Sequence, residues 1–409
     1  MARRRALILV ESHPRCTGLL YIQAAQRLGL HPIVLSAEPA RYDYIATEGI
    51  DAICVDTHSL DALIRECSRL DKTYDIAGIT SDIESVYATV GKVCRYFDLP
   101  GPNPASVERC CDKFIQRQLL AEAGVPIPAY RLATNVTDVE SAAAEIGLPV
   151  ILKPVVGAGS RGVRLCCNLG ELVEHTAYLL GGKHIWRSPP KILVEEFAQG
   201  PYYNVDIMGD EVIGIYAGEV PPPHFVLRES ILPAPLTDAE RKRIVDISLS
   251  CLQALGLGWG PTNVELRWTK RGPVVIEFNP RLPGTPCPQM IQLAYGVDII
   301  TEHIKLAIGD QWDLRKTRSQ TAAARYLVAD SDGTLDWIGG VSRAAAASGV
   351  AEVRFYVEPK TAIIRKGDSE DGIGHVIVSS PSPARTKATL QRAVDLISWS
   401  ITPLPSLGE

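Results

Sequence analysis

Residues 274–284 read VVIEFNPRLPG, and this stretch decides the fold. Its apolar residues at every second position alternate with a series that includes Glu277 and Asn279, which is the period of a β-strand. Pro280 cannot donate a hydrogen bond to a strand ladder, so the strand should stop there and release Arg281 into a loop.

A second strand-like run lies just upstream. Residues 262–268, TNVELRW, repeat the alternation, and a short turn after them would fold the two runs into a hairpin. Counting outward from Arg271, Glu265 faces Glu277 on the same side of the hairpin. Two facing carboxylates repel each other unless a cation lies between them. A solvated sheet face with an arginine partner is the alternative interpretation of an isolated hairpin.

Composition sets the broad class. The 409 residues, of which 46% are hydrophobic and 22% charged, predict a globular protein of two or three domains. The formal charge of −5 gives no general reason to expect nucleic acid or an anionic membrane as a partner. No apolar run approaches the length of a signal-peptide core or a membrane span, so we expect a cytoplasmic protein. The ten cysteines lack CxxC and paired Cys/His spacings, which favours buried thiols over disulfides or a zinc site.

Strands and helices alternate over the first hundred residues, which predicts a doubly wound parallel sheet. The turn after the first strand, ESHPRCTG at 11–18, has one glycine and a proline, so dinucleotide binding there is not expected. The break LPGPNP at 99–104 ends this domain. Predicted strands are 6–10, 31–36, 50–55 and 75–79, and predicted helices are 19–28, 60–70 and 85–97.

Two cationic side chains mark the next region. A single helix is expected over 106–123, where Lys113 and Arg117 are four residues apart and share a face. Taken alone, that face is more typical of an ordinary solvated helix surface. Residues 148–154 then form an apolar strand with Lys153 near its end.

A glycine-rich loop follows this strand directly. Residues 157–162, GAGSRG, match GxGxxG, but they join two strand-like runs instead of opening a helix, as in flaps that cover phosphates. The glycines at 157, 159 and 162 (Gly157, Gly159, Gly162) let the backbone approach oxygen atoms closely, and Ser160 adds a donor. No GxxxxGK[ST] motif exists in the chain, which excludes a Walker-type loop.

The remaining elements follow in order. A strand over 192–197 ends in two adjacent acids, and residues 221–235 form an irregular, proline-rich stretch. A helix over 238–255, with Thr237 as its N-cap, precedes the hairpin. After Arg281 we expect helices at 289–294 and 299–308, then strands at 321–328, 350–356, 362–365 and 375–379, and a final helix at 385–401 that completes a small α+β module.

The order of these features resembles the ATP-grasp superfamily and, within it, carboxylate–amine ligases of the L-amino-acid (dipeptide) ligase type. The features are a helix lysine, a strand lysine, the glycine hairpin, VEEF at 194–197, and the pair Glu265 and EFNPR at 277–281. The resemblance covers nearly the whole chain. It implies an α/β fold with a Rossmann-like domain (1–104), an ATP-grasp domain (105–315, with a glycine-rich lid at about 128–195) and a C-terminal α+β module (316–409).

The resemblance also implies roles for individual residues. Lys113 and Lys153 would contact the ATP phosphates as compact charges, beneath the flap. Glu265, Glu277 and Asn279 would hold two Mg²⁺ (or Mn²⁺) ions. Arg281 would stabilise the oxyanion on the substrate. The adenine contacts would be Glu195, Glu196, Phe197 and Ala198, and the substrate loop would involve His224, Arg228, Asp206 and Glu219.

The implied reaction converts a carboxylate and ATP into an acyl phosphate and ADP, after which an amine displaces phosphate and an amide forms. A closed flap would keep water from the intermediate. The sequence departs from the family near the substrate: Gly200-Pro201 is followed by Tyr-Tyr-Asn, so Asp206 or a tyrosine hydroxyl would replace the usual acidic ribose contact.

Several readings therefore stay open. The partner is an amino-acid-like small molecule, and a homodimer is one assembly that the sequence allows. The alternatives are ring closure to a lactam in specialised metabolism, an ATP-grasp carboxylase or purine-pathway ligase, and a nucleotide-binding regulator without chemistry.

Overall fold

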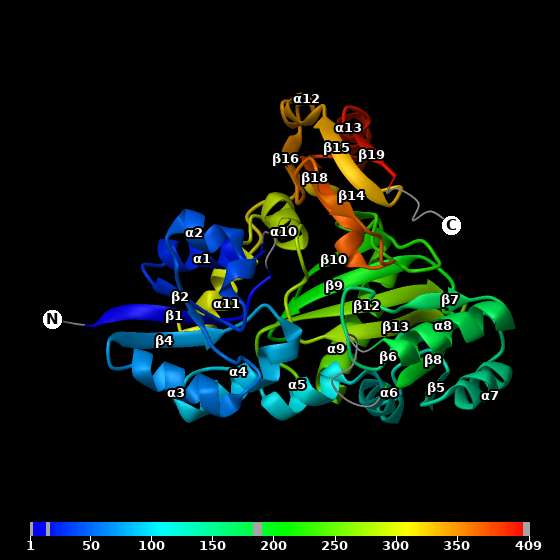
Figure 1. Ribbon diagram of the computed structural model, residues 1–409, viewed down its shortest axis with the longest axis horizontal. Helices are drawn as coiled ribbons and strands as arrows, with labels where there is room; N and C mark the ends of the chain where they lie inside the picture. The colour runs from blue at the N-terminus through cyan, green and yellow to red at the C-terminus, as the bar shows by residue number, and fades with distance from the viewer. Residues whose placement is uncertain (1–2, 14–16, 183–189, 404–409) are drawn as a thin grey trace.

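The fold is taken from a computed structural model, which describes residues 3–13, 17–182 and 190–403. A central antiparallel sheet lies in the middle of the molecule (Figure 1). An N-terminal parallel sheet flanks it on one side, a lid of four strands and two helices on the other, and the C-terminal region sits above it.

The N-terminal sheet has the predicted doubly wound form. Its strands are all parallel in the order β3-β2-β1-β4, and helices pack beside it. Helix α11 (Ile299–Ala307) joins this domain from far along the chain, where its buried His303 meets the hydroxyl of Tyr21 through Nδ1 at 2.5 Å. The elements are β1 (Arg4–Val10), α1 (Thr17–Arg27), β2 (His31–Ser36), α2 (Asp43–Glu48), β3 (Asp51–Cys54), α3 (Leu60–Leu70), β4 (Tyr74–Thr80) and α4 (Glu84–Tyr96).

The helix expected over 106–123 is two helices, α5 (Pro104–Cys111) and α6 (Lys113–Glu122). They are separated by Asp112, whose backbone is extended and whose side chain accepts hydrogen bonds from the amides of Phe114 and Ile115. This aspartate is an N-cap, which satisfies two amides that a helix start leaves unpaired. The prediction of one continuous helix was wrong, because the N-cap ends one helix and begins the next.

The lid is an antiparallel four-stranded sheet in the order β5-β8-β6-β7. Strands β6 and β7 are paired on either side of the glycine-rich flap (residues 157–162), so the flap joins two strands as predicted. The elements are β5 (Tyr130–Ala133), α7 (Val136–Ile146), β6 (Val150–Pro154), β7 (Arg164–Cys166), α8 (Leu169–Gly181) and β8 (Ile192–Glu196).

The central sheet has eight strands in the order β13-β12-β9-β10-β11-β14-β18-β16. It continues from the β12–β13 hairpin into the C-terminal region, because β11 pairs with β14, where alanines lie opposite β11 and Glu229 forms an ion pair with Arg325. The C-terminal region therefore shares this sheet and does not form a layer of its own. Strand β11 also corrects a prediction, because it lies inside residues 221–235, which were expected to be irregular throughout. The strands are β9 (Tyr202–Met208), β10 (Glu211–Glu219), β11 (Glu229–Leu232), β12 (Pro261–Thr269), β13 (Gly272–Asn279), β14 (Thr321–Val328), β16 (Val350–Phe355) and β18 (Gly372–Ser380).

The other helices and strands complete the C-terminal half. Helix α9 (Asp238–Ala254) begins with the predicted Thr237 cap, and α10 (Cys287–Tyr295) follows the Arg281 loop. The final helix, α13 (Pro383–Asp395), stops short of the predicted end, because Ser398–Thr402 forms strand β19 with alternating half-buried apolar side chains. The remaining elements are β15 (Gly333–Gly339), α12 (Val341–Ala345) and β17 (Ala362–Ile363), with the small sheet in the order β17-β15-β19.

The hairpin pairs Glu265 with Glu277 as predicted, but a β-bulge that residue counting did not anticipate produces this register. Its ladder starts at Thr269 opposite Gly272, a register that would put Glu265 opposite Ile276. A β-bulge at Ile276 shifts the register by one residue, so that Glu265 faces Glu277. The bulge therefore brings the two carboxylates into a directly opposed pair.

Candidate active site

The three strands β13, β12 and β9 present a polar floor on one face of the central sheet. Directly opposed residues in antiparallel strands share a face. The residues between them, including Val264 and Phe278, are buried in the hydrophobic core on the other side. The floor consists of two cross-strand rows, Glu277–Glu265–Asn204 and Asn279–Asn263–Asp206.

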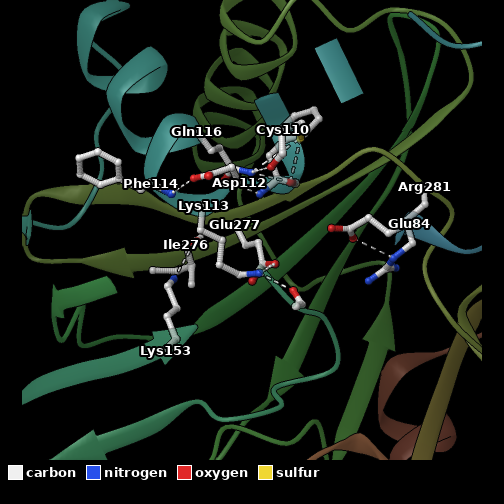
Figure 2. Close-up of polar contacts among 12 residues, drawn as sticks. Glu84, Cys110, Asp112, Lys113, Phe114, Gln116, Lys153, Ile276, Glu277 and Arg281 are labelled. Atoms are coloured by element: carbon white, nitrogen blue, oxygen red, sulfur yellow. Dashed lines mark hydrogen bonds and ion pairs between the residues drawn. The ribbon is translucent and has the colours of Figure 1, made fainter. Parts of the chain in front are cut away.

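The two opposed carboxylates have unequal electrostatic surroundings. Burial, together with the charge of Glu277, raises the pKa of Glu265 to about 7. Burial would also raise the pKa of Glu277, but the charges of Lys113 and Lys153 outweigh it and hold that pKa below its ordinary value. Lys113 Nζ lies 3.0 Å from Glu277 Oε1 (Figure 2). It also donates to the carbonyl of Gly157 in the flap. One predicted phosphate lysine thus links a predicted metal ligand to the flap.

Helix α6 is fixed against β13 by a side chain that sequence reasoning missed. The Gln116 amide donates to the carbonyl of Phe278 at 2.8 Å and accepts from its amide at 3.0 Å, as a neighbouring strand would. The buried face of α6 consists of Lys113, Gln116, Arg117 and Leu120, at the i, i+3, i+4, i+7 spacing of a core-facing stripe. This spacing was the sequence signal that could have identified a buried face of the helix. The interpretation of this face as solvated, which the helix taken alone favours, does not hold, because these polar residues have partners on β8 and β13.

A buried cluster of three charges lies beneath the flap. Glu195 Oε1 accepts from Arg117 Nε at 2.6 Å, and Glu195 Oε2 lies 2.5 Å from Lys153 Nζ. Burial would raise the pKa of Glu195, but the charges of Arg117 and Lys153 lower it further than burial raises it. Burial lowers the pKa of Lys153, while Glu195 opposes that shift. Both oxygens of the residue expected at the adenine edge are therefore bound to cations in this structure.

The β-bulge at Ile276 also provides a hydrogen-bond acceptor to this cluster. The carbonyl of Ile276 accepts from Lys153 Nζ at 3.5 Å (Figure 2). The same carbonyl accepts from the guanidinium of Arg117. The backbone distortion that aligns the acids thus also anchors two of the cations.

The other residues expected around the adenine lie along the end of β8. Glu196 forms an ion pair with Arg271 at 2.8 Å, and its backbone continues to the buried Ala198. The ring of Phe197 lies 5.7 Å from that of Phe225, and the guanidinium of Arg267 approaches both rings. These contacts place the 195–198 segment beside the proline-rich stretch.

Arg281 meets a carboxylate from the N-terminal domain. Its Nε lies 3.4 Å from Oε2 of Glu84, the first residue of α4 (Figure 2). Glu84 was not among the residues picked out from the sequence. It follows the carboxyl end of β4, the edge of a parallel sheet at which ligands commonly bind, and that position was the signal that could have found it. The loop after β13 thereby joins the two domains at the polar floor.

The structure does not bring all the predicted substrate residues to this floor. Asp206 lies in it but is fully buried, accepts from Asn263 Nδ2 at 2.7 Å, and has its pKa raised to about 7 by burial. It has no exposed surface to offer a ribose. The strand pleat turns Glu219 to the opposite face of β10, where Glu229 is its cross-strand neighbour.

The other two lie beside the proline-rich stretch. The backbone amide of Arg228 donates to the carbonyl of Glu219, and the ring of His224 packs against Gly367 in the C-terminal region.

The donor set of the floor fits a hard cation. Glu265 and Glu277 offer carboxylate oxygens and Asn279 an amide oxygen, the ligands that Mg²⁺ prefers. Burial and the charge of Glu277 raise the pKa of Glu265 more than the charges of Arg281 and Lys153 lower it, and a bound cation would favour the ionised form of this carboxylate. Within residues 3–13, 17–182 and 190–403, no group of three or more His, Cys, Asp or Glu side chains is arranged to hold a metal ion by itself.

Two protein-family models match the chain. Residues 112–315 match the ATP-binding domain of the carbamoyl-phosphate synthase large chain, and residues 325–402 match the C-terminal domain 2 of L-amino acid ligases. The first match contains every element of the polar floor, and the second contains most of the C-terminal region. No helix in the part of the chain that the structure describes has the length and apolar character needed to cross a membrane.

Two curated proteins are similar in sequence to this chain. The chain is 60% identical over 407 residues to the uncharacterised protein y4rH of Sinorhizobium fredii, covering 99% of this chain and 85% of that protein. It is 29% identical over 238 residues to human carnosine synthase 1, covering 53% of this chain and only 29% of that longer enzyme.

Solved structures share the fold over almost the whole chain. An L-amino acid ligase from Bacillus licheniformis has a TM-score of 0.82 at 19% identity, covering 98% of this chain and 100% of that one. N5-carboxyaminoimidazole ribonucleotide synthetase from Thermotoga maritima has a TM-score of 0.70 at 21% identity, with the same two coverages.

Proposed function

Because the chain belongs to the ATP-grasp ligase family, we propose that it joins the carboxylate of an amino acid to an amine, in the manner of L-amino acid ligases. ATP-dependent carboxylate–amine ligation is the activity that the family matches support directly. The amino-acid substrate is the finer proposal. The observation that carries it is the 3.4 Å approach of Arg281 to Glu84 at the end of the polar floor.

The pairing of Arg281 with Glu84 is complementary to a zwitterion. An α-amino acid carries a carboxylate and an ammonium group close together. Arg281 binds the carboxylate and, later, the oxyanion, while Glu84 binds the ammonium group. Without a substrate the two protein charges neutralise each other. An amino acid entering between them replaces one ion pair by two.

The reaction then follows from the charges beneath the flap. Lys113 and Lys153 hold the phosphates of ATP, and a carboxylate oxygen of the substrate attacks the γ-phosphorus. The bond to the β,γ-bridging oxygen breaks and ADP leaves. The amine nitrogen next attacks the acyl carbon, the bond to the phosphate oxygen breaks, and the amine loses a proton as the amide forms.

Glu265, Glu277 and Asn279 are the residues that would hold Mg²⁺, with Mn²⁺ as an alternative ion. When bound, the metal supplies positive charge against the phosphate oxygens. Glu277 is paired with Lys113 in this structure at 3.0 Å. Lys113 would then turn from Glu277 toward the phosphates when the metal–nucleotide complex binds.

Two other enzymatic roles share the fold. A carboxylase or purine-pathway ligase is compatible with the N5-carboxyaminoimidazole ribonucleotide synthetase likeness. The match of residues 325–402 to an L-amino acid ligase domain favours an amino-acid substrate instead. Ring closure to a lactam uses the same chemistry within one molecule and is a possible form of the same activity.

The test is a pooled screen of amino acids with ATP and Mg²⁺ that follows ADP, inorganic phosphate and product mass. Two substrates joined with loss of water identify intermolecular ligation, and one substrate minus water identifies a lactam. Phosphate release that depends on bicarbonate or a ribonucleotide, with no response to any amino acid, would overturn the proposal. The Glu84→Gln variant should raise KM for the amino acid far more than KM for ATP.

A further inference from the structure

The flap is held down by a loop of the C-terminal region. This loop, Lys366–Asp371, is called the latch below. The amide of Ser369 donates to the carbonyl of Gly159 at 2.9 Å, and Arg161 Nη2 donates to Glu370 Oε1 at 2.6 Å. A second carboxylate, that of Asp368, lies 3.6 Å from Arg161 Nε. The latch therefore contacts two flap residues through both backbone and charge.

Hydrogen bonds within the latch hold its backbone in shape. Asp371 accepts from the amides of Lys366 and Gly367 at 2.7 and 2.8 Å, and Asp368 accepts from the amide of Glu370 at 2.8 Å. Gly367 has a φ of +72°, and a Cβ there would lie within 3.0 Å of the His224 ring, so this position requires glycine. These bonds fix the direction in which the two remaining carboxylate oxygens point.

Two other contacts join the flap to the ATP-grasp domain. Lys113 reaches the carbonyl of Gly157 from below, and Ser160 Oγ donates to the carbonyl of Phe225 at 3.1 Å. Both contacts lie on the side of the ATP-grasp domain. From the C-terminal region, the latch reaches Arg161 through Asp368, which is only 3% exposed, and Glu370, which is 44% exposed. Arg161 is thus the flap side chain on which that region acts.

We propose that the latch clamps the flap over the acyl phosphate, with Asp368 and Glu370 as positioning residues that act through Arg161. This inference rests on the proposed function. If the flap opens before the amine attacks, water replaces the amine at the acyl carbon, phosphate leaves and the free carboxylate is regenerated. One ATP is then consumed without an amide. The role of the latch is to keep the ratio of phosphate released to amide formed near one.

The test is a double-mutant cycle of Arg161→Gln, Glu370→Gln and the double variant, with phosphate and amide measured together. The matched control is Glu145→Gln, which neutralises an Arg–Glu pair of similar exposure elsewhere in the lid. We expect each single variant to raise the phosphate-to-amide ratio about two- to fivefold, the range that loss of an exposed ion pair permits. The double variant should match Arg161→Gln, because Arg161→Gln already removes the contacts of both Glu370 and Asp368 with the flap, so the further loss of Glu370 adds nothing.

A second readout separates this inference from the proposed function. Hydrogen exchange of the flap amides should quicken by a similar about two- to fivefold factor in Glu370→Gln and stay unchanged in Glu145→Gln, whichever substrate the enzyme uses. An unchanged ratio together with unchanged flap exchange would overturn the latch. A wild-type enzyme that forms no amide from any amino acid, while Glu370→Gln still quickens flap exchange, would overturn the proposed function alone.

Discussion

Substitution of Glu195 by glutamine is the sharpest perturbation of the site. Glu195 holds Arg117 at 2.6 Å and Lys153 at 2.5 Å, and none of the three side chains is more than 3% exposed. Glutamine keeps the shape but removes the charge, so two buried cations lose their shared partner. If Glu195 served only to read the adenine edge, the same change would alter nucleotide choice and leave the fold intact.

The contact distances set the size of the effect. At an effective dielectric of about 20, each contact represents a gross attraction of about 6 kcal/mol, most of which offsets the cost of removing the charges from water. Removing one partner of a buried pair typically costs about 3–5 kcal/mol, because the remaining charge stays buried. The folded-to-unfolded ratio should therefore fall by about 150- to 5,000-fold.

The assay is urea unfolding of the wild type, Glu195→Gln and the control Glu196→Gln, with parallel measurement of ATP and GTP binding. Glu196 is the next residue on the same strand, and its pair with Arg271 is exposed, so its loss should cost about 0–1 kcal/mol. The reasoning is refuted if the free energy of unfolding of Glu195→Gln lies within roughly 1 kcal/mol of that of Glu196→Gln, while the preference for ATP over GTP is lost.

Three further predictions follow from single side chains. Arg281→Gln should lower kcat by at least about 100-fold while ATP affinity, measured by calorimetry, stays within about threefold; retained turnover would remove Arg281 from catalysis. Gly159→Ala should raise KM for ATP by about 5- to 30-fold, because φ is +70° there and a Cβ would lie 2.5 Å from Ser369 Oγ; an unchanged KM would show that the flap tolerates the methyl group. Burial lowers the folded pKa of His303 to about 3, whereas the unfolded residue titrates near 6.5, so its stability contribution is full above pH 6.5 and is lost as the pH falls. The wild type should therefore lose about 2 kcal/mol more than His303→Phe between pH 7 and pH 5 in urea unfolding, and equal losses would contradict the assignment.

Local periodicity was enough to predict much of the fold. The parallel N-terminal sheet, the flap between two strands and the capped helix α9 follow from apolar spacing, glycines and the N-cap residue Thr237. Each of these signals lies within a few residues of chain. The pairing of Glu265 with Glu277 was also predicted, although the bulge at Ile276 that produces it is invisible to counting.

Features that depend on distant parts of the chain were missed. Helix α6 looks solvated in isolation, because the partners of Arg117 and Lys113 lie about 80 and 160 residues further along the sequence. Glu84 is an ordinary acid at a helix start until the fold brings Arg281 beside it. The latch contacts the flap across more than 200 residues, as the Arg161–Glu370 bond shows. No local pattern distinguishes such partners from other surface charges.

The roles of Lys113, Lys153, Glu277 and Arg281 in ligation stay predictions. The structure places Lys113 and Lys153 at β13 through Glu277 and the carbonyl of Ile276, and pairs Arg281 with Glu84. The adenine and ribose contacts are less well defined, since Glu195 is occupied by cations and Asp206 is buried.

The central claim, activation of a carboxylate as an acyl phosphate, is tested most directly by isotope transfer. A substrate amino acid labelled with ¹⁸O in its carboxylate is turned over with ATP and Mg²⁺, and the released phosphate and nucleotide are analysed by mass spectrometry. The mechanism predicts one ¹⁸O atom in each inorganic phosphate formed, with ADP as the nucleotide product. Unlabelled phosphate, or AMP and pyrophosphate in place of ADP, would contradict it.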